Sequence, residues 1–221
     1  MSIKSITLIA FLFTSTTIFA ADELCGNPNQ ITRNSIVRVE GGNTVGSGVV
    51  IGKNHILTAA HVVKNLDEIF VNVNGRHNEA TMISMQPDLD LALLRVPTGD
   101  TAPLKLLKGS PELKDNVWAM GYALGNALVA TMGQYKGTYD KKLYTSASVN
   151  YGQSGGGLVT CYKGQHVLAG MIKAFGAIMK NGKLERRDDF SVAARSQDIR
   201  RFVASNQQLA GVREPLAEYI W

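Results

Sequence analysis

Residues 151–158 read YGQSGGGL, with one serine set between a glycine–glutamine pair and three consecutive glycines. Glycine weakens ordinary helices and strands, but it adopts backbone conformations that other residues avoid. The cluster therefore indicates an unusual backbone path or a close approach by another molecule. Taken alone, the stretch is equally typical of a turn that contains Ser154.

Short apolar runs with turn signals between them lie on both sides of this stretch. The runs SIVRV and IFVNVN alternate apolar and polar residues, as half-buried antiparallel strands do, and Asn74-Gly75 is a hairpin signal. A second set of runs extends from VWAMGYALG to DFSVAA, and the looser residues 97–116 separate the two sets. The spacing predicts two all-β halves. A helix closes the chain, with Ser196 as its N-terminal cap and Asp198 in its first turn.

The first twenty residues have the pattern of a secretory signal. Lys4 precedes the apolar run ITLIAFLF, and the segment ends at Ala20. A membrane anchor is the alternative, but TSTT interrupts the run, which is shorter than the roughly 20 apolar residues of a bilayer span. We expect cleavage near Ala20, a periplasmic or secreted protein, and no stable membrane insertion after cleavage.

Charge and cysteine content narrow the function classes further. The formal net charge of the 221 residues is +5, and the cationic residues are dispersed, so no nucleic-acid partner is predicted. The only cysteines are Cys25 and Cys161. In an oxidising compartment one disulfide is the natural pairing, and two unpaired thiols are the alternative.

Three local patterns carry candidate chemistry: LTAAH ends at His61, DLDLALLRV contains Asp90, and GQSGG contains Ser154. Each alone has a structural explanation. Together they supply a nucleophile, a base and a carboxylate that orients the base, as acyl transfer by serine requires. The backbone N–H groups of Gly152 and Ser154 are the candidate oxyanion donors. Asp88, two residues before Asp90, is the alternative acid.

These motifs, in the order His, Asp, Ser, resemble those of chymotrypsin-like (trypsin-like) serine endopeptidases. GSGVVIGKNHILTAAHVV, LDLALLRV and SASVNYGQSGGGLV are most similar to the protease domain of bacterial HtrA-type and related small secreted enzymes. The resemblance implies two six-stranded antiparallel β-barrels with the site between them. It also implies that Ser154 is the nucleophile, His61 the general base and Asp90 the orienting acid.

The expected organisation combines this fold with the residue patterns. It comprises a signal peptide (1–20), an N-terminal arm (21–34), a first barrel (35–105), a linker (106–116), a second barrel (117–195), and a C-terminal helix and tail (196–221).

Departures from the family pattern bear on activation and regulation. Gln153 stands where digestive trypsin-type enzymes have an aspartate that pairs with a newly cut amino terminus, so activation of that kind is not expected. Gly157 replaces a common proline. About eighteen residues follow the proposed helix, so we expect no PDZ domain.

Specificity is predicted from position in the family. Ser148, Val149 and Asn150 on one side, with Lys173, Ala174 and Phe175 on the other, are expected to frame the primary pocket, and the second group to pair with an extended substrate. Without an acid at Ser148, a preference for Lys or Arg is disfavoured. Val149 favours an apolar residue, and Lys173 an acidic one.

The sequence therefore predicts a secreted or periplasmic serine endopeptidase that acts on polypeptide substrates without a cofactor. No close His pair with a carboxylate and no CxxC pair indicates a metal site. A catalytically silent binding protein of the same fold is the alternative function. Ester hydrolysis by an α/β-hydrolase disagrees with the β-rich pattern and the order of the triad.

Overall fold

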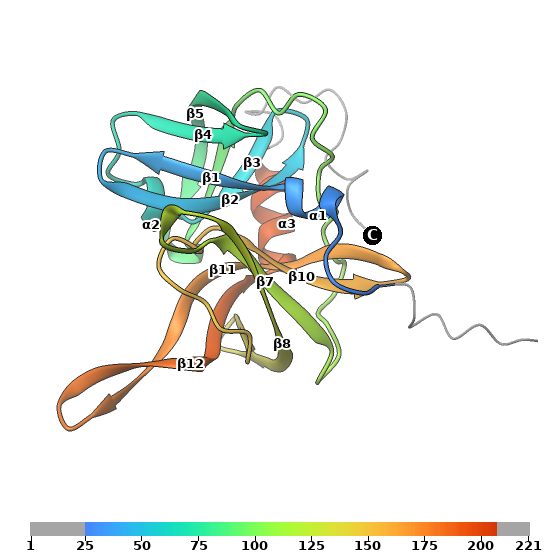
Figure 1. Cartoon of the computed structure of the whole chain (residues 1–221), viewed down its shortest axis with the longest axis vertical. Helices are drawn as coiled ribbons and strands as arrows, with labels where there is room; N and C mark the ends of the chain where they lie inside the picture. The colour runs from blue at the N-terminus through green and yellow to red at the C-terminus, as the bar shows by residue number, and fades with distance from the viewer. Residues whose placement is uncertain (1–24, 207–221) are drawn as a thin grey trace, which may run out of the picture.

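The computed structural model of the chain describes residues 25–206, and the expected signal peptide lies outside this range. Two closed six-stranded antiparallel β-barrels stand against each other, and one C-terminal helix packs beside them (Figure 1). The fold expected from the sequence is confirmed.

The first barrel is built from six strands in the order β1-β2-β3-β6-β5-β4. Its strands are β1 (Ile36–Gly41), β2 (Thr44–Gly52), β3 (His55–Thr58), β4 (Ile69–Val73), β5 (Arg76–Gln86) and β6 (Leu91–Arg95). Asn74 and Gly75 form the predicted hairpin turn between β4 and β5, and both have positive φ. This conformation matches the type I′ turn that Asn-Gly favours.

The second barrel has the order β10-β11-β12-β9-β8-β7. Its strands are β7 (Asn116–Tyr122), β8 (Leu128–Tyr139), β9 (Lys142–Thr145), β10 (Gly157–Tyr162), β11 (Gln165–Lys180) and β12 (Lys183–Arg195). The YGQSGGGL stretch therefore comprises the end of the loop between β9 and β10 and the first two residues of β10.

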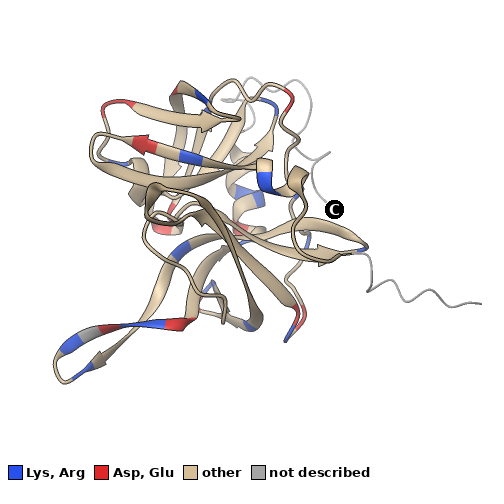
Figure 2. Cartoon of the chain, in the orientation of Figure 1, with Lys and Arg blue, Asp and Glu red and all other residues tan. Residues whose placement is uncertain are grey.

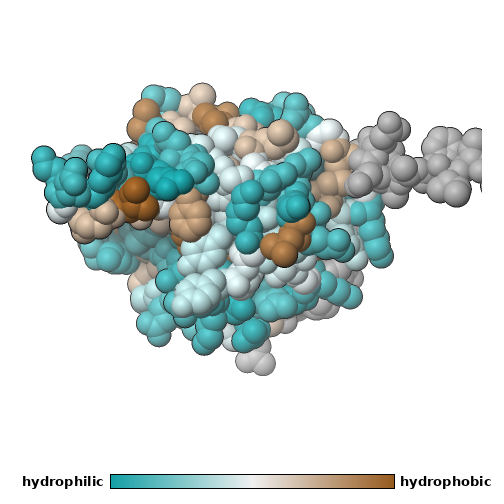
Figure 3. Space-filling view, turned by 90° about the horizontal axis from the view of Figure 1, so that it is seen from below, coloured by the Kyte–Doolittle hydropathy of each residue, from teal (hydrophilic) through white to brown (hydrophobic). Residues whose placement is uncertain are grey.

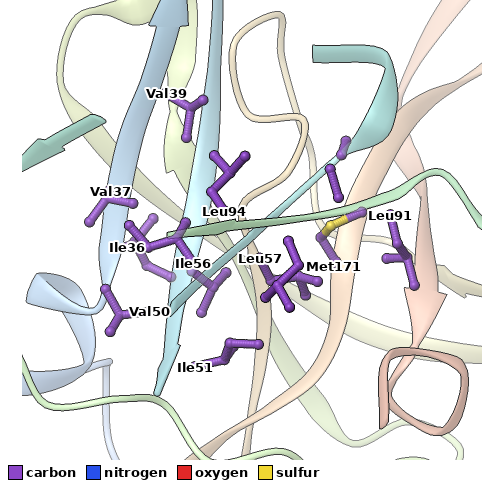
Figure 4. Packing of buried hydrophobic residues seen from close by; sticks show 14 of the residues in the cluster. Ile36, Val37, Val39, Val50, Ile51, Ile56, Leu57, Leu91, Leu94 and Met171 are labelled. Atoms are coloured by element: carbon purple, nitrogen blue, oxygen red, sulfur yellow. The ribbon is translucent and has the colours of Figure 1, made fainter. Parts of the chain in front are cut away.

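One hydrophobic cluster joins the two barrels. Leu57 and Leu91 of the first barrel and Met171 of β11 are fully buried and lie close together (Figure 4). Burial of side chains of this size contributes about 1.5–3 kcal/mol each. The shared cluster thus fixes the position of one barrel against the other, on which a site between them depends.

The segment between the barrels is hydrogen bonded to both. The N–H of Leu104 donates to the carbonyl of Val50 at 2.8 Å, and the N–H of Leu107 donates to the carbonyl of Leu168 at 3.0 Å. The segment that links the barrels is consequently held against both of them.

In the described part of the chain, three α-helices accompany the barrels: α1 (Gln30–Asn34), α2 (Ala60–Val63) and α3 (Ser196–Ser205). Asp198 lies in the first turn of α3 as expected, where it pairs with Arg195 at 2.7 Å. The expectation that Ser196 caps this helix was wrong. Arg195 holds the cap position, and the Ser196 hydroxyl instead donates to the carbonyl of Gly109 at 2.7 Å.

Cys25 and Cys161 form a disulfide that ties the start of the described chain to β10, with their Cα atoms 5.7 Å apart. Within residues 25–206, no helix is long and apolar enough to cross a membrane.

Strands β11 and β12 continue beyond the barrel as a two-stranded hairpin. We call residues 176–187 the arm; it projects from the body at the lower left of Figure 1. The arm was not predicted, because residues 176–189 have no regular apolar alternation. The signal that marks it is Asn181-Gly182, a second Asn-Gly dipeptide with positive φ at both residues.

Candidate active site

His61 lies on α2, a four-residue helix that follows β3 directly. Its Nδ1 lies 3.0 Å from both carboxylate oxygens of Asp90. A carboxylate only accepts hydrogen bonds, so Nδ1 carries the proton and Nε2 keeps its lone pair. The imidazole is 43% exposed and the Asp90 side chain 16%, so the histidine opens toward the solvent from a more enclosed acid.

Asp90 occupies a turn that directs its carboxylate at the histidine. It has left-handed backbone angles of φ 58° and ψ 43°, directly after the short 3-10 turn Pro87–Leu89. Its Oδ1 also accepts the backbone N–H of His61 at 3.0 Å, and its carbonyl accepts the N–H of Ala60 at 3.2 Å. Asp88 is exposed and makes no hydrogen bond to His61.

The pKa of Asp90 lies below its ordinary value. Burial raises this pKa, but hydrogen bonds from the side chain and backbone of His61, with the charges of His61 and Lys173, lower it by more. Asp90 is consequently ionised at neutral pH and can stabilise a protonated His61.

Ser154 is held in a turn that two glycines make possible. Gly152 and Gly155 have φ of 85° and 84°, a region that side chains rarely enter. A Cβ on Gly152 would collide with the carbonyl of Tyr122, and one on Gly155 with the carbonyl of Ser47. These glycines therefore serve both the unusual backbone path and the close approach that the sequence indicated.

The N–H groups of Gly152 and Ser154 are the predicted oxyanion donors. The carbonyl of Tyr151 accepts the N–H of Leu124 at 2.7 Å. In a trans peptide, the N–H of Gly152 then points the opposite way. No group within residues 25–206 accepts a hydrogen bond from either N–H. The loop thus presents two unused donors beside the serine.

Ser47 of β2 was missed by sequence reasoning, and it supports this loop from the other barrel. Its hydroxyl donates to the carbonyl of Gly152 at 2.7 Å and accepts the N–H of Tyr122 at 2.8 Å. Its N–H donates to the carbonyl of Ser154 at 2.8 Å. The available sequence signal was a serine between two glycines, Gly46 and Gly48, at the start of the apolar run of β2.

A cavity of ≈ 480 Å³ opens between the barrels beside these groups. His61 and Ser154 line it, as do the predicted substrate-binding residues Val149, Asn150, Lys173, Ala174 and Phe175. Ser148 is not among the lining residues. Tyr151, which was not predicted, contacts Phe175 edge to face with ring centroids 5.2 Å apart.

Lys173 contacts both halves of the site. Its carbonyl accepts the hydroxyl of Ser154 at 3.2 Å, and its ammonium donates to the carbonyl of Leu89 at 3.1 Å. The ammonium is therefore directed at the Asp90 turn.

Curated relatives match about half of this chain. A probable periplasmic serine endoprotease, DegP-like, of Pseudomonas fulva is 34% identical over 127 residues, which is 52% of this chain and 26% of that protein. The serine endoprotease DegS of Salmonella typhimurium is 35% identical over 130 residues, which is 52% of this chain and 36% of that protein. The match thus spans about a quarter to a third of the length of these relatives.

Solved structures share the fold. The serine endoprotease from Yersinia pestis has a TM-score of 0.68 at 24% identity, covering 88% of this chain and 68% of that one. The HtrA-type protease AlgW with tripeptide has a TM-score of 0.65 at 23% identity, covering 78% and 60%. At these identities the likeness supports the double barrel.

A profile of known sequences decides the family. The profile described as trypsin-like peptidase domain matches residues 46–170, which include His61, Asp90 and Ser154. The match extends over more than half of the chain, and this chain therefore belongs to the trypsin-like peptidase domain family.

Proposed function

We propose that this protein is a serine endopeptidase that cleaves polypeptides through an acyl-enzyme. The observation that carries the proposal is the alignment of Asp90 with Nδ1 of His61 at the mouth of a cavity that Ser154 also lines. The named activity of the relatives, serine endoprotease, supports the same reaction.

In the proposed mechanism, Ser154 attacks the scissile carbonyl carbon while Nε2 of His61 takes its proton. The imidazolium then donates that proton to the leaving amine, and Asp90 stabilises the charge on the ring. Water attacks the resulting ester with His61 again as the base, which releases the acid product and restores Ser154.

The resting hydroxyl of Ser154 is bonded to the carbonyl of Lys173 and must turn toward His61 for attack. Substrate binding provides a reason for this change. The N–H of the substrate residue before the scissile bond competes for the Lys173 carbonyl, which frees the hydroxyl. Catalytic hydrogen bonds often tighten only when the substrate is bound.

The oxyanion of the tetrahedral intermediate is assigned to the N–H groups of Gly152 and Ser154. One preorganised donor of this kind contributes roughly 3–4 kcal/mol of transition-state stabilisation in a well-studied protease. Because the peptide bond between Tyr151 and Gly152 is already oriented by Leu124, no activating cleavage is needed to form the hole.

For the primary pocket we propose a small or medium apolar side chain. The buried Val149 lines the cavity, whereas the ammonium of Lys173 already donates a hydrogen bond to the Leu89 carbonyl. We place the protein in the periplasm or outside the cell, in line with the periplasmic relatives and with the signal pattern of residues 1–20.

A fluorophosphonate probe tests the proposal. We expect the probe to label wild-type protein and the variant Ser110→Ala, whose serine is exposed and remote from the site, but not Ser154→Ala. A folded wild-type protein that stays unlabelled at neutral pH would favour the binding-protein alternative. Peptide hydrolysis should also fall on the acidic side of the pH profile, because histidine in model peptides titrates near about pH 6.5.

A further inference from the structure

Strand β11 has one open edge that begins inside the cavity and continues along the arm. Its pairing with β10 ends at Gly157 and Met171. The N–H and carbonyl of Ile172 are still taken up by Gly156 and Gly155, each at 2.8 Å. From there to Lys180, β11 pairs only with β12.

The hairpin turn determines which backbone groups face this open edge. In a two-residue hairpin, the pair that flanks the turn, here Lys180 and Lys183, exchanges hydrogen bonds within the hairpin. Ile178 and Gly176, counted back from Lys180, face β12 in the same way. The register shift between Phe175 and Gly176 leaves residues 188–190 of β12 unpaired but interrupts no residue of β11, so the alternation along β11 continues. The alternate residues Phe175, Ala177 and Met179 therefore direct their N–H and carbonyl groups to the open edge.

Among residues 25–206, no backbone group pairs with this edge beyond Ile172. Proteins usually block such edges with proline, short strands or covering segments, because an unpaired row of donors and acceptors is a template for another chain. The row from Phe175 to Met179 extends about 14 Å at the usual rise per residue.

The base of the arm is fixed beside the cavity. The guanidinium of Arg186 donates to the side chain of Asn150 at 2.7 Å and lies over the ring of Phe175 at 5.4 Å. Gly176 leaves room for the ring of Phe190, which a Cβ at this position would strike. The open edge is thus held in continuity with the residues that line the cavity.

The arm carries four cations and one anion, and the two aspartates that follow it, Asp188 and Asp189, pair with its arginines. Lys180 pairs with Glu185 at 3.4 Å and Arg186 with Asp188 at 2.8 Å, and Figure 2 shows both signs along the arm. Ile178 and Met179 are exposed, and Figure 3 shows hydrophobic surface among the hydrophilic residues of the projection. With these aspartates counted, residues 176–189 have a formal net charge of +1, and the arm offers a backbone edge and apolar contacts.

We propose that the arm extends the substrate-binding strand, so that a polypeptide substrate pairs with β11 well beyond the cavity on the amino side of its scissile bond. With the substrate residues numbered P1, P2 and onward from that bond, P1 meets the carbonyl of Lys173, and antiparallel pairing brings P3, P5 and P7 opposite Phe175, Ala177 and Met179. The ligand is an extended, unfolded segment, recognised through its backbone. This inference rests on the proposed function.

Two peptide p-nitroanilides of alternating threonine and valine, with valine at P1 and lengths of three and seven residues, test the proposal. We expect kcat/KM to be about 10-fold higher for the longer peptide, since each added backbone hydrogen bond has a modest net value. Equal kcat/KM for the two lengths would overturn it.

Two N-methylated versions of the seven-residue peptide, equal in mass, test which of its amides pairs with β11. A methyl on the P5 amide, which faces Ala177, should remove most of the gain from length. The same methyl on the P6 amide, which faces away from β11, should leave most of it. Equal losses at P5 and P6 would contradict the pairing.

Ala177→Pro tests the same contact from the protein side. Proline removes the N–H on the open edge, while the hydrogen-bonded pairs with β12 stay at other residues. We expect the ratio of kcat/KM between the long and short peptides to fall toward one in Ala177→Pro and to persist in Ala177→Val. An unchanged ratio in Ala177→Pro would overturn the proposal.

Binding of the fluorescein-labelled seven-residue peptide to Ser154→Ala separates this inference from the proposed function. Anisotropy should show binding that Ala177→Pro weakens and Ala177→Val retains, whether or not wild-type protein hydrolyses the peptide. Sedimentation tests whether a second copy of this chain, rather than a substrate, pairs with the open edge. A wild-type dimer that Ala177→Pro dissociates, together with no effect of peptide length, would assign the edge to a second copy and overturn the proposal.

Discussion

The ammonium of Lys173 donates to the carbonyl of Leu89 across the two barrels at 3.1 Å, one residue before Asp90. The carbonyl of the same lysine accepts the hydroxyl of Ser154. One residue of β11 therefore contacts the segments that carry the proposed acid and the proposed nucleophile. Burial has the largest effect on the pKa of Asp90 and raises it. The hydrogen bonds and charge of His61 lower this pKa, and the charge of Lys173 lowers it by a smaller amount.

Replacing Lys173 by methionine should lower kcat/KM and alter its pH dependence. We expect a loss of about 10-fold, the value of one charge-assisted hydrogen bond, because the Asp90 turn loses its contact with the second barrel. The acidic limb of the kcat/KM profile should move to higher pH, since the lost cation no longer opposes the binding of a proton by the His61–Asp90 pair. His61 and Lys173 are the groups whose charges act on Asp90.

Lys173→Arg is the matched control, because it keeps the charge. Its acidic limb should remain where it is in the wild type. If Lys173→Met loses activity but the acidic limb of its kcat/KM profile stays at the wild-type pH, the lysine has only a packing role.

Ser47→Ala should impair catalysis through the loop that carries Gly152 and Ser154, the proposed oxyanion donors. The substitution leaves the carbonyl of Gly152 and the N–H of Tyr122 without their partner in a buried position. Unsatisfied buried groups cost about 1–3 kcal/mol each, so the melting temperature should fall measurably. We expect kcat to fall more than KM rises, since the proposed oxyanion donors of this loop would act on the transition state. Ser205→Ala, at the end of α3, should change neither the melting temperature nor kcat.

Gly155→Ala should give a poorly folded or inactive protein. The residue has φ of 84°, and its Cβ would meet the Ser47 carbonyl and the Thr58 hydroxyl. The unfavourable backbone region costs about 1–2 kcal/mol, and the collision adds about 1–3 kcal/mol. Chemical denaturation should show this loss. Gly109→Ala is the control, because nothing lies within 4 Å of its Cβ; similar stability in both variants would contradict the role given to Gly155.

The acid dependence of stability should report the environment of Asp90. Its pKa in the folded protein lies below the ordinary value of 3.8, so its contribution to stability is present above that pH and is lost as the pH falls through the folded pKa. Wild type should therefore exceed Asp90→Asn in melting temperature by a constant margin near neutral pH. The margin should shrink below about pH 4. A margin that grows on acidification would have the wrong sign.

Local sequence patterns predicted two all-β halves, and the family resemblance added the six-stranded barrels and the candidate residues Ser154, His61 and Asp90. Apolar alternation and the Asn-Gly turn at residues 74–75 depend on neighbours in the chain, and so do the positive φ angles of Gly152 and Gly155. The choice between Asp88 and Asp90 did not follow from such patterns. It depends on a left-handed turn that directs only Asp90 toward a histidine 29 residues earlier.

The contacts that support the site join residues far apart in the sequence. Ser47 meets Gly152 across 105 residues, Lys173 meets Leu89 across 84, and Arg186 meets Asn150 across 36. No periodicity or turn preference encodes these pairs, because each forms only when a barrel closes or when the two barrels pack together. The residue types and the strand pattern were readable from the chain, whereas the orientation of Lys173, the support from Ser47 and the open edge of β11 follow from packing.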